Sequence, residues 1–399
     1  MQRGIATFTL DYGRCPRWLF ERMVKLGREM TQVLVSEYGA DEFVRRIADP
    51  VWFQSLGTVL AFDWNASGLT TILTAALKEA IRGQEKDLGI FICGGKGKTS
   101  RKTPDEILGW GENLSLQQAD VKSLVYNSKM AAKVDSSLVQ DGFQIYHHSF
   151  FFSVKRSPSG ISGPSAWTVV QQGMNTVSQT ARRYHWFSDT ITDLVCEPHS
   201  GIASQIKQRS VLNLTAKESQ KNQKISRQLA TLGYGRFAKD IEIIRKHSSE
   251  LSRMIALRLR SGRALRRQGE SLTLLELADT EFSSHSVMAE DFAKSRYLEK
   301  ILNRLSDSQP KTYEALLATA GVGPKTIRAL SLVSEVIYGA KPSYEDPARY
   351  SFAHGGKDAT PYPVDRPTYD QTIRILSDVV RKSRINVVEK DKILRRITS

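Results

Sequence analysis

The residues with the clearest chemistry form a glycine-rich turn, 321–326 (GVGPKT), between two helical patterns within 313–338. Glycine permits a positive φ and lets another backbone approach closely, because it has no Cβ. Pro324 suits the first position of the second helix, where its missing N–H costs nothing. The backbone N–H groups and the dipole at the start of that helix favour an anion. The turn is therefore predicted to bind phosphate without reading base sequence, through Gly321, Val322, Gly323 and Thr326.

This turn resembles the hairpin of the helix-hairpin-helix DNA-binding motif. In the glycosylase superfamily that carries the motif, a Pro-Val-Asp sequence begins a later helix, and here 363–365 reads PVD. The resemblance implies that Lys325 matches the lysine of the bifunctional members and that Asp365 matches the acid that all members share. Such a lysine attacks a sugar C1′ to give a Schiff base, and such a carboxylate stabilises an oxocarbenium-like charge. The target base must first leave the stack.

The same two residues also have simpler interpretations. Lys325 and Asp365 are 40 positions apart, a longer gap than this family usually shows. A hairpin lysine can simply contact a phosphate, and an aspartate before a helix can simply cap it. Two hypotheses follow: an enzyme that removes a base or cuts the strand at damaged DNA with no required cofactor, and a DNA-binding module without activity.

Polar residues in the first half suggest a third hypothesis, a metal-dependent DNA nuclease. The strand-like run 143–154 carries His147 and His148, which face opposite sides of a strand. Carboxylates and imidazoles are ligands for divalent ions, here Mg²⁺ or Mn²⁺. The candidate residues of this alternative site are Asp141, His147, His148, Glu197 and His199.

Basic residues beside glycines or aromatic residues suggest further phosphate contacts. The run 94–99 (GGKGKT) follows a strand-like run, but Ile92 stands where a nucleotide-binding P-loop needs its first glycine. A loop that contacts nucleic acid is therefore favoured over an NTPase site. The run 181–186 (ARRYHW) interleaves basic and aromatic residues, as nucleic-acid surfaces do, although half-buried helix residues give the same pattern. The predicted basic contacts are Lys96, Lys98, Arg182, Arg183, Arg260, Arg263 and Arg266.

The charge of the chain favours a polyanionic partner. The formal net charge is +15, and 201–270 holds sixteen Lys or Arg against five Asp or Glu. Such focusing is typical of a phosphate-binding surface, and no segment is apolar for long enough to span a bilayer. The N-terminal residues lack the long apolar stretch of a secretory signal. The three cysteines are far apart, which argues against a disulfide scaffold and indicates a reducing cytoplasm.

The hydrophobic patterns predict an α+β fold in two domains. A mixed α+β domain is expected at 1–205, followed by an all-α DNA-binding domain at 206–399 with the hairpin at 313–338. A capping box is expected where Thr103 precedes Pro104 and Glu106. The strand-like runs are 5–10, 59–64, 89–93, 143–154 and 167–171. The helical patterns are 16–38, 68–82, 215–232, 236–267, 289–305, 313–319, 324–338 and 369–382.

Over most of its length, the chain resembles the family known as domain of unknown function 763. The resemblance rests on RGIATFTLDYGRCPRWLFERM, FDWNASGLTT, GGKGKTSRKTPDEI, YHHSFFF, VVQQGMN, ARRYHW, EPHSGI and PYPVDR. It implies a prokaryotic, often thermophilic setting, and it supplies no activity.

Overall fold

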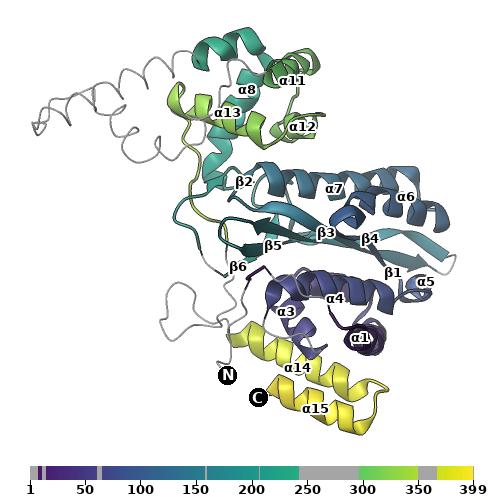
Figure 1. Cartoon of the computed structure of the whole chain (residues 1–399). Helices are drawn as coiled ribbons and strands as arrows, with labels where there is room; N and C mark the ends of the chain where they lie inside the picture. The colour runs from purple at the N-terminus through teal and green to yellow at the C-terminus, as the bar shows by residue number, and fades with distance from the viewer. Residues whose placement is uncertain are drawn as a thin grey trace, which may run out of the picture. The chain divides into compact units, whose positions relative to one another are not determined.

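The chain forms two compact units (Figure 1) in a computed structural model that describes residues 8–10, 15–60, 65–157, 160–205, 207–241, 296–348 and 366–398. The first unit comprises Met1–Ser136, Gln140–Val211 and Glu345–Ser399. The second comprises Ser137–Val139 and Leu212–Tyr344. The second unit is therefore inserted into the sequence of the first.

The first unit is built on a five-stranded sheet in which all neighbouring strands are antiparallel, in the order β1-β3-β4-β5-β6. Alternation along a strand sends successive side chains to opposite faces. In β3, Phe151 joins the core under α1–α4, whereas Phe150 stacks with Trp167 on the other face. The strands are β1 (Ile90–Lys96), β3 (Gln144–Ser157), β4 (Gly160–Asn175), β5 (Thr180–Phe187) and β6 (His199–Ser204).

Helices cover both faces of this sheet (Figure 1), with α1, α3 and α4 on one face and α6 and α7 on the other. Local sequence explains where α3 begins, because Asp49 accepts a hydrogen bond from Val51 N at 2.8 Å and Pro50 takes the first helical position. The N-terminal helices are α1 (Arg17–Tyr38), α2 (Ala40–Ile47), α3 (Pro50–Val59), α4 (Ala66–Ala80) and α5 (Glu85–Leu88). They are followed by η1 (Gly97–Lys102), α6 (Thr103–Asn113), α7 (Gln118–Ser137) and, after β5, η2 (Ser188–Thr190).

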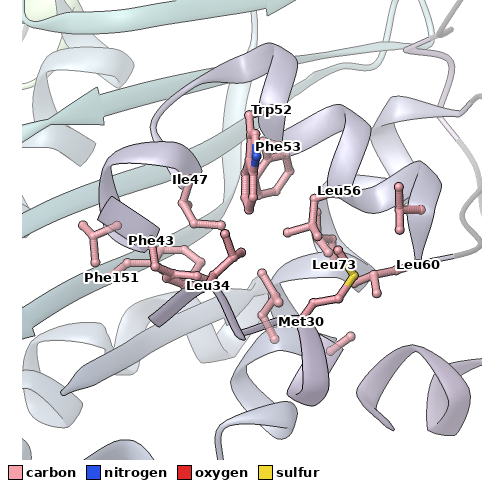
Figure 2. Close-up of a cluster of buried hydrophobic side chains, with 14 of the residues drawn as sticks. Met30, Leu34, Phe43, Ile47, Trp52, Phe53, Leu56, Leu60, Leu73 and Phe151 are labelled. Carbon is pink, nitrogen blue, oxygen red and sulfur yellow. The ribbon is translucent and has the colours of Figure 1, made fainter. Parts of the chain in front are cut away.

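The largest apolar core of the first unit lies among α1–α4 and one face of the sheet (Figure 2). It also takes in Leu376, Val379 and Val380 from the C-terminal helix α14 (Arg366–Lys382) and Ile393 from α15 (Val387–Thr398). Helix α14 contacts α1 and α3, and α15 contacts α3. Burial of this apolar surface is the main stabilising term for the unit. None of the described helices has both the length and the apolar character needed to cross a bilayer.

The second unit is mainly helical in its described part. Its helices pack around α8, where buried Asn222 Nδ2 donates to the Ser331 and Ala340 carbonyls and Ser226 Oγ lies 2.9 Å from Ser334 Oγ. Its elements are η3 (Lys217–Ser219), α8 (Gln220–Thr231), α11 (Arg296–Ser308), α12 (Tyr313–Ala318), α13 (Pro324–Val336) and the short strands β2 (Val139–Gln140) and β7 (Leu212–Asn213).

The predicted fold class is confirmed, but the expected arrangement changes in three places. Helices α14 and α15 belong to the first unit, so the chain does not divide once near residue 205. Val59 ends a helix rather than opening a strand, and 61–64 lie outside the described residues. The capping box is wrong: η1 runs directly into α6, so Thr103 is already helical, and Glu106 Oε2 accepts from Gly94 N instead.

Candidate functional site

The predicted phosphate-binding turn is a tight connection between α12 and α13. Helix α12 is capped by Thr312, whose Oγ1 accepts from Ala315 N at 3.0 Å. Pro324 occupies the first turn of α13, and the first backbone bond of that helix runs from Ile327 N to Gly323 O at 3.1 Å. Helical geometry gives the N–H groups before Ile327 no acceptor inside the helix, and the helix dipole makes this end positive.

The two glycines of the turn have different roles. Gly321 has a φ of +91°, and a Cβ on it would lie 2.3 Å from Cδ1 of Ile301 in α11. Gly323 has an extended φ of −148°, and a Cβ on it would meet nothing within 4 Å. Gly321 is therefore needed for the fold of the turn, while Gly323 faces open space at the start of α13.

The other residues of the turn that were predicted to contact DNA differ in their exposure to solvent. Lys325 is exposed, whereas Val322 and Thr326 are buried at 3% and 1% exposure. The side chains of Val322 and Thr326 therefore pack inward, and only their backbone is available to a phosphate. Asp365, the expected acid, lies outside the described residues, as do Arg260, Arg263 and Arg266.

The basic and aromatic run of β5 is not a surface. Arg182 and Arg183 are both fully buried, so the prediction that they contact DNA is wrong for this structure. Strand alternation sends them to opposite faces of the sheet. Arg183 Nε donates to His185 Nε2 at 2.8 Å, and its guanidinium lies 4.6 Å from the ring centre of Phe53.

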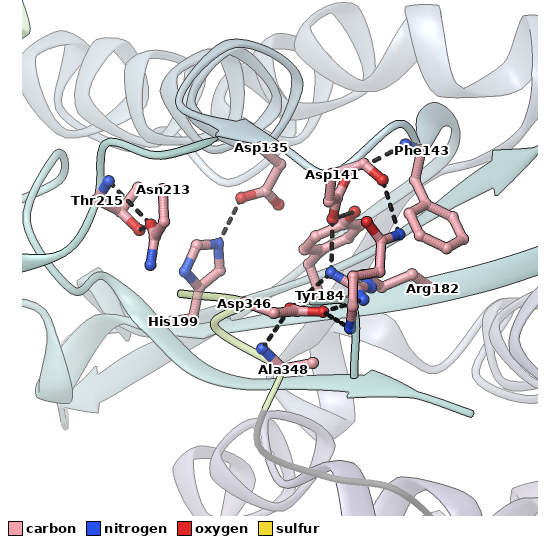
Figure 3. Close-up of polar contacts among 11 residues, drawn as sticks. Asp135, Asp141, Phe143, Arg182, Tyr184, His199, Asn213, Thr215, Asp346 and Ala348 are labelled. Atoms are coloured by element: carbon pink, nitrogen blue, oxygen red, sulfur yellow. Dashed lines mark hydrogen bonds and ion pairs between the residues drawn. The ribbon is translucent and has the colours of Figure 1, made fainter. Parts of the chain in front are cut away.

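Arg182 is the centre of a buried ion-pair cluster (Figure 3). Its guanidinium donates to Asp141 at 3.0 Å and to both carboxylate oxygens of Asp346 at 2.9 and 2.8 Å. Asp141 also accepts from the Tyr184 hydroxyl at 2.7 Å. Burial raises the pKa of Asp141, and the charge of Arg182 opposes that shift. The cluster fastens residue 346 to β5, which gives Asp141 a structural partner rather than a metal.

The predicted nuclease residues are not all brought together, because His147 and His148 lie on opposite faces of the sheet. His147 Nε2 lies 3.2 Å from Thr74 Oγ1 on the α4 face, and His148 Nε2 lies 2.9 Å from Ser128 Oγ on the α7 face, as strand alternation predicts. Within the described ranges, no three His, Cys, Asp or Glu side chains are grouped so that they could hold a metal ion. Glu197 is exposed at a φ of +47°.

A buried polar chain crosses the α7 face instead, centred on Asp135, which the sequence did not single out. Ser128 donates to His148 Nε2, His148 Nδ1 donates to Gln171 Oε1 at 2.9 Å, and Gln171 Nε2 donates to Asp135. This direction fits a neutral His148, whose pKa is lowered by burial. The signal in the sequence was the polar pair Gln171 and Gln172, which directly follows the apolar residues Val169 and Val170 in β4.

The outer end of this chain is His199 (Figure 3), whose Nε2 donates to Asp135 Oδ1 at 2.5 Å. Trp186 Nε1 also donates to Asp135, at 3.1 Å. The His199 side chain is 8% exposed, whereas that of Asp135 is completely buried. A histidine oriented by a carboxylate can transfer protons through its other ring nitrogen.

The glycine-rich run 94–99 is not a loop after the strand: it forms the end of β1 and the start of η1, and it is anchored by hydrogen bonds. Lys78 Nζ donates to Gly94 O at 3.1 Å and to Glu106 Oε2 at 2.6 Å, and the same oxygen accepts from Gly94 N at 2.8 Å. A Cβ on Gly94 would lie 2.3 Å from the His148 carbonyl oxygen. Exposed basic side chains follow this anchor, namely Lys96, Lys98, Arg101 and Lys102.

Comparison with known proteins gives a family and no activity. The family model described as "Protein of unknown function (DUF763)" matches residues 4–364. No curated protein and no solved structure matches the chain.

Proposed function

Because the chain belongs to the DUF763 family, whose description assigns no reaction, we propose its function from its geometry: it is a DNA-processing protein that binds the DNA backbone through the turn 321–326. The observation that carries this proposal is the open space beside Gly323 at the start of the 13-residue helix α13. A phosphate can approach the backbone there and lie on the helix axis, where the dipole is positive.

Charge supports a polyanionic ligand for the second unit. The described residues of that unit from 212 onward carry thirteen Lys or Arg against six Asp or Glu. Phosphate binding by backbone groups and surface cations is independent of base sequence and sensitive to salt. We therefore expect the affinity for duplex DNA to fall steeply as the salt concentration rises. The widely spaced cysteines fit the reducing cytoplasm that we propose as the setting.

The reaction that we propose first is base removal or strand cleavage at a damaged nucleotide. The exposed Lys325 stands next to the proposed phosphate site, where its amine could attack the C1′ of a sugar. Attack on an abasic sugar yields a Schiff base with loss of water, and elimination of the 3′ phosphate then breaks the strand. Asp365 is proposed as the carboxylate that stabilises the charged sugar. This chemistry requires no metal.

A second candidate reaction, hydrolysis of the strand by the first unit, is favoured by one observation. His199 is held by Asp135 at 2.5 Å and is the partly exposed end of a buried polar chain. A histidine in this setting can remove a proton from water. The described residues bring no three possible metal ligands together, so a Mg²⁺ or Mn²⁺ ion in this reaction would need ligands from outside them.

Incubation of the full chain with labelled DNA that carries one abasic site, in EDTA or in Mg²⁺ or Mn²⁺, separates these reactions. Wild type, Lys325→Ala and His199→Gln should be compared, and borohydride should be added to trap a Schiff base. Cutting in EDTA that disappears in Lys325→Ala, together with a trapped adduct, supports the first reaction. Metal-dependent cutting that disappears only in His199→Gln supports the second.

Binding without cutting under all conditions would leave a non-enzymatic DNA-binding module. The binding proposal itself is tested by fluorescence anisotropy with wild type and Gly323→Ala at several salt concentrations. Wild type that binds no DNA at low salt would overturn the proposal.

A further inference from the structure

An aromatic ring stands beside the proposed phosphate site, at the start of α11. The hydroxyl of Tyr297 donates to the carbonyl oxygen of Gly321 at 2.5 Å. Tyr297 is nevertheless 57% exposed. A surface tyrosine more commonly lays its ring on apolar neighbours and leaves its hydroxyl in water. Here the hydroxyl is bound to the turn and much of the residue faces solvent.

The hydrogen bond fixes where this ring can be. Tyrosine has only two side-chain torsions, so one bond at its far end removes most of its freedom. The anchor is itself held, because Arg304 of α11 donates to the adjacent carbonyl of Ala320 at 2.6 Å and Ile301 of the same helix lies beside Gly321. The ring is therefore preorganised, and Tyr297 loses little additional side-chain entropy when a ligand contacts it.

A second side chain on the same face of α11, that of Arg304, binds the preceding carbonyl of the turn. Arg304 Nη1 donates to Ala320 O at 2.6 Å, and Arg304 is also exposed. Residues seven apart, such as Tyr297 and Arg304, share one face of a helix. The two side chains thus bind the carbonyl oxygens of Ala320 and Gly321, which would otherwise repel a phosphate, while a Cβ on Gly323 would face open space.

The distance between the ring's anchor and the phosphate site suits one DNA strand. The Cα atoms of Gly321 and Gly323 are at most about 7.6 Å apart, since consecutive Cα atoms are ~3.8 Å apart. Successive nucleotides of a strand rise ~3.4 Å in a duplex. A strand held by its phosphate at Gly323 therefore brings a base about one or two nucleotides away to the neighbourhood of the Gly321 anchor and the ring of Tyr297.

We propose that Tyr297 is a stacking platform for an unpaired base, so that the turn prefers DNA with a bulged, flipped or single-stranded nucleotide over a continuous duplex. Both faces of a base inside a duplex are covered by its neighbours, and only an unstacked base can lie on a protein ring. This inference rests on the proposed function, because the turn must first hold the backbone.

The test is binding of the full chain to two DNA molecules of the same length, one fully paired and one with a single bulged 2-aminopurine. Wild type should bind the bulged DNA about tenfold more tightly than the duplex, which corresponds to the stacking of one base. It should also quench 2-aminopurine fluorescence. Tyr297→Leu should lose the preference and the quenching, and its affinity for the duplex should match that of Tyr297→Phe, since both variants lack the hydroxyl that covers the Gly321 carbonyl.

Tyr297→Phe is the matched variant, because it keeps the ring and loses only the bond to Gly321. It should still quench, with a preference between those of wild type and Tyr297→Leu. Equal affinity of wild type for the two DNA molecules, or quenching that persists in Tyr297→Leu, would overturn the inference while the proposed function stands. Failure of wild type to bind either DNA would remove both.

Discussion

A Cβ on Gly321 would lie only 2.3 Å from Cδ1 of Ile301, closer than two non-bonded carbon atoms can approach. Because of this overlap and the φ of +91°, the turn cannot accommodate Gly321→Ala without strain. A non-glycine residue at left-handed φ costs about 1–2 kcal/mol, and overpacking adds about 1–3 kcal/mol. We expect the free energy of unfolding of the second unit to fall by roughly 2–5 kcal/mol, as measured by urea denaturation.

Gly323→Ala is the matched control for this prediction. Its φ of −148° suits any residue, and its Cβ would meet nothing within 4 Å, so stability should change by less than about 1 kcal/mol. Affinity for DNA should nevertheless fall, because the methyl group enters the space proposed for the phosphate. Equal stability losses in the two variants would show that the glycines do not differ as described.

Arg182 should be among the most sensitive residues of the first unit. Its replacement by methionine leaves the buried carboxylates of Asp141 and Asp346 without their cation. Removal of one partner from a buried ion pair costs about 3–5 kcal/mol. We expect a loss of unfolding free energy in that range, measured by urea denaturation.

Lys207→Met removes a cation in the same way from an exposed pair. Lys207 contacts Glu345 at 2.9 Å, with 36% and 77% of the two side chains exposed. Exposed pairs contribute about 0–1 kcal/mol, so this variant should resemble wild type. If Arg182→Met cost no more than Lys207→Met, the cluster would not fasten residue 346 to the sheet.

Glu106 should hold the glycine-rich run 94–99 in place. In Glu106→Ala, the buried N–H of Gly94 loses its acceptor and Lys78 loses its carboxylate. An unsatisfied buried donor costs about 1–3 kcal/mol, and amide exchange at Gly94 should accelerate. The neighbouring Asp105→Ala removes an exposed acid from the same helical turn and should leave that exchange unchanged. Identical exchange in the two variants would contradict the anchoring role of Glu106.

Elements with a strong local signal were predictable from the sequence. The apolar periodicity of 16–38 gave α1 almost to its ends, and the β-branched and aromatic run 143–154 gave β3. Val59 was misassigned because an apolar run has the same composition at the end of a buried helix as in a strand. Thr103 was misassigned as a cap because a cap depends on where the preceding turn ends, and η1 continues into the helix.

The polar sites were predictable only where residues close in sequence determine the direction of a side chain or the conformation of the backbone. Alternation placed His147 and His148 on opposite faces, and the glycines of the turn were expected to permit a positive φ, which Gly321 adopts. Asp135 was missed because its partners, such as His199, come from distant strands that only the folded sheet brings together. Arg182 was misread as a surface residue because its carboxylate partner Asp346 lies 164 positions away.

The last prediction concerns acid, and it follows from the burial of His147. Burial, reinforced by the charges of His148 and Lys96, lowers the pKa of His147 to about 3, against 6.5 in the unfolded chain. Between pH 3 and pH 6.5, His147 is therefore protonated in the unfolded chain and neutral in the folded protein. The contribution of His147 is therefore complete above pH 6.5 and is lost as the pH falls towards 3, by about 1.4 kcal/mol per pH unit.

Replacement of His147 by glutamine isolates this contribution, because an amide can still bond to Thr74 or Ser149 but does not titrate. From pH 6.5 to pH 5 the wild type should lose about 2 kcal/mol more unfolding free energy than His147→Gln. Urea denaturation at both pH values measures the difference. His185 is present in both proteins and cancels in the comparison, so the difference reports His147 together with its interaction with His148. Parallel pH profiles would mean that His147 is protonated in the fold, and that its buried position does not keep it neutral.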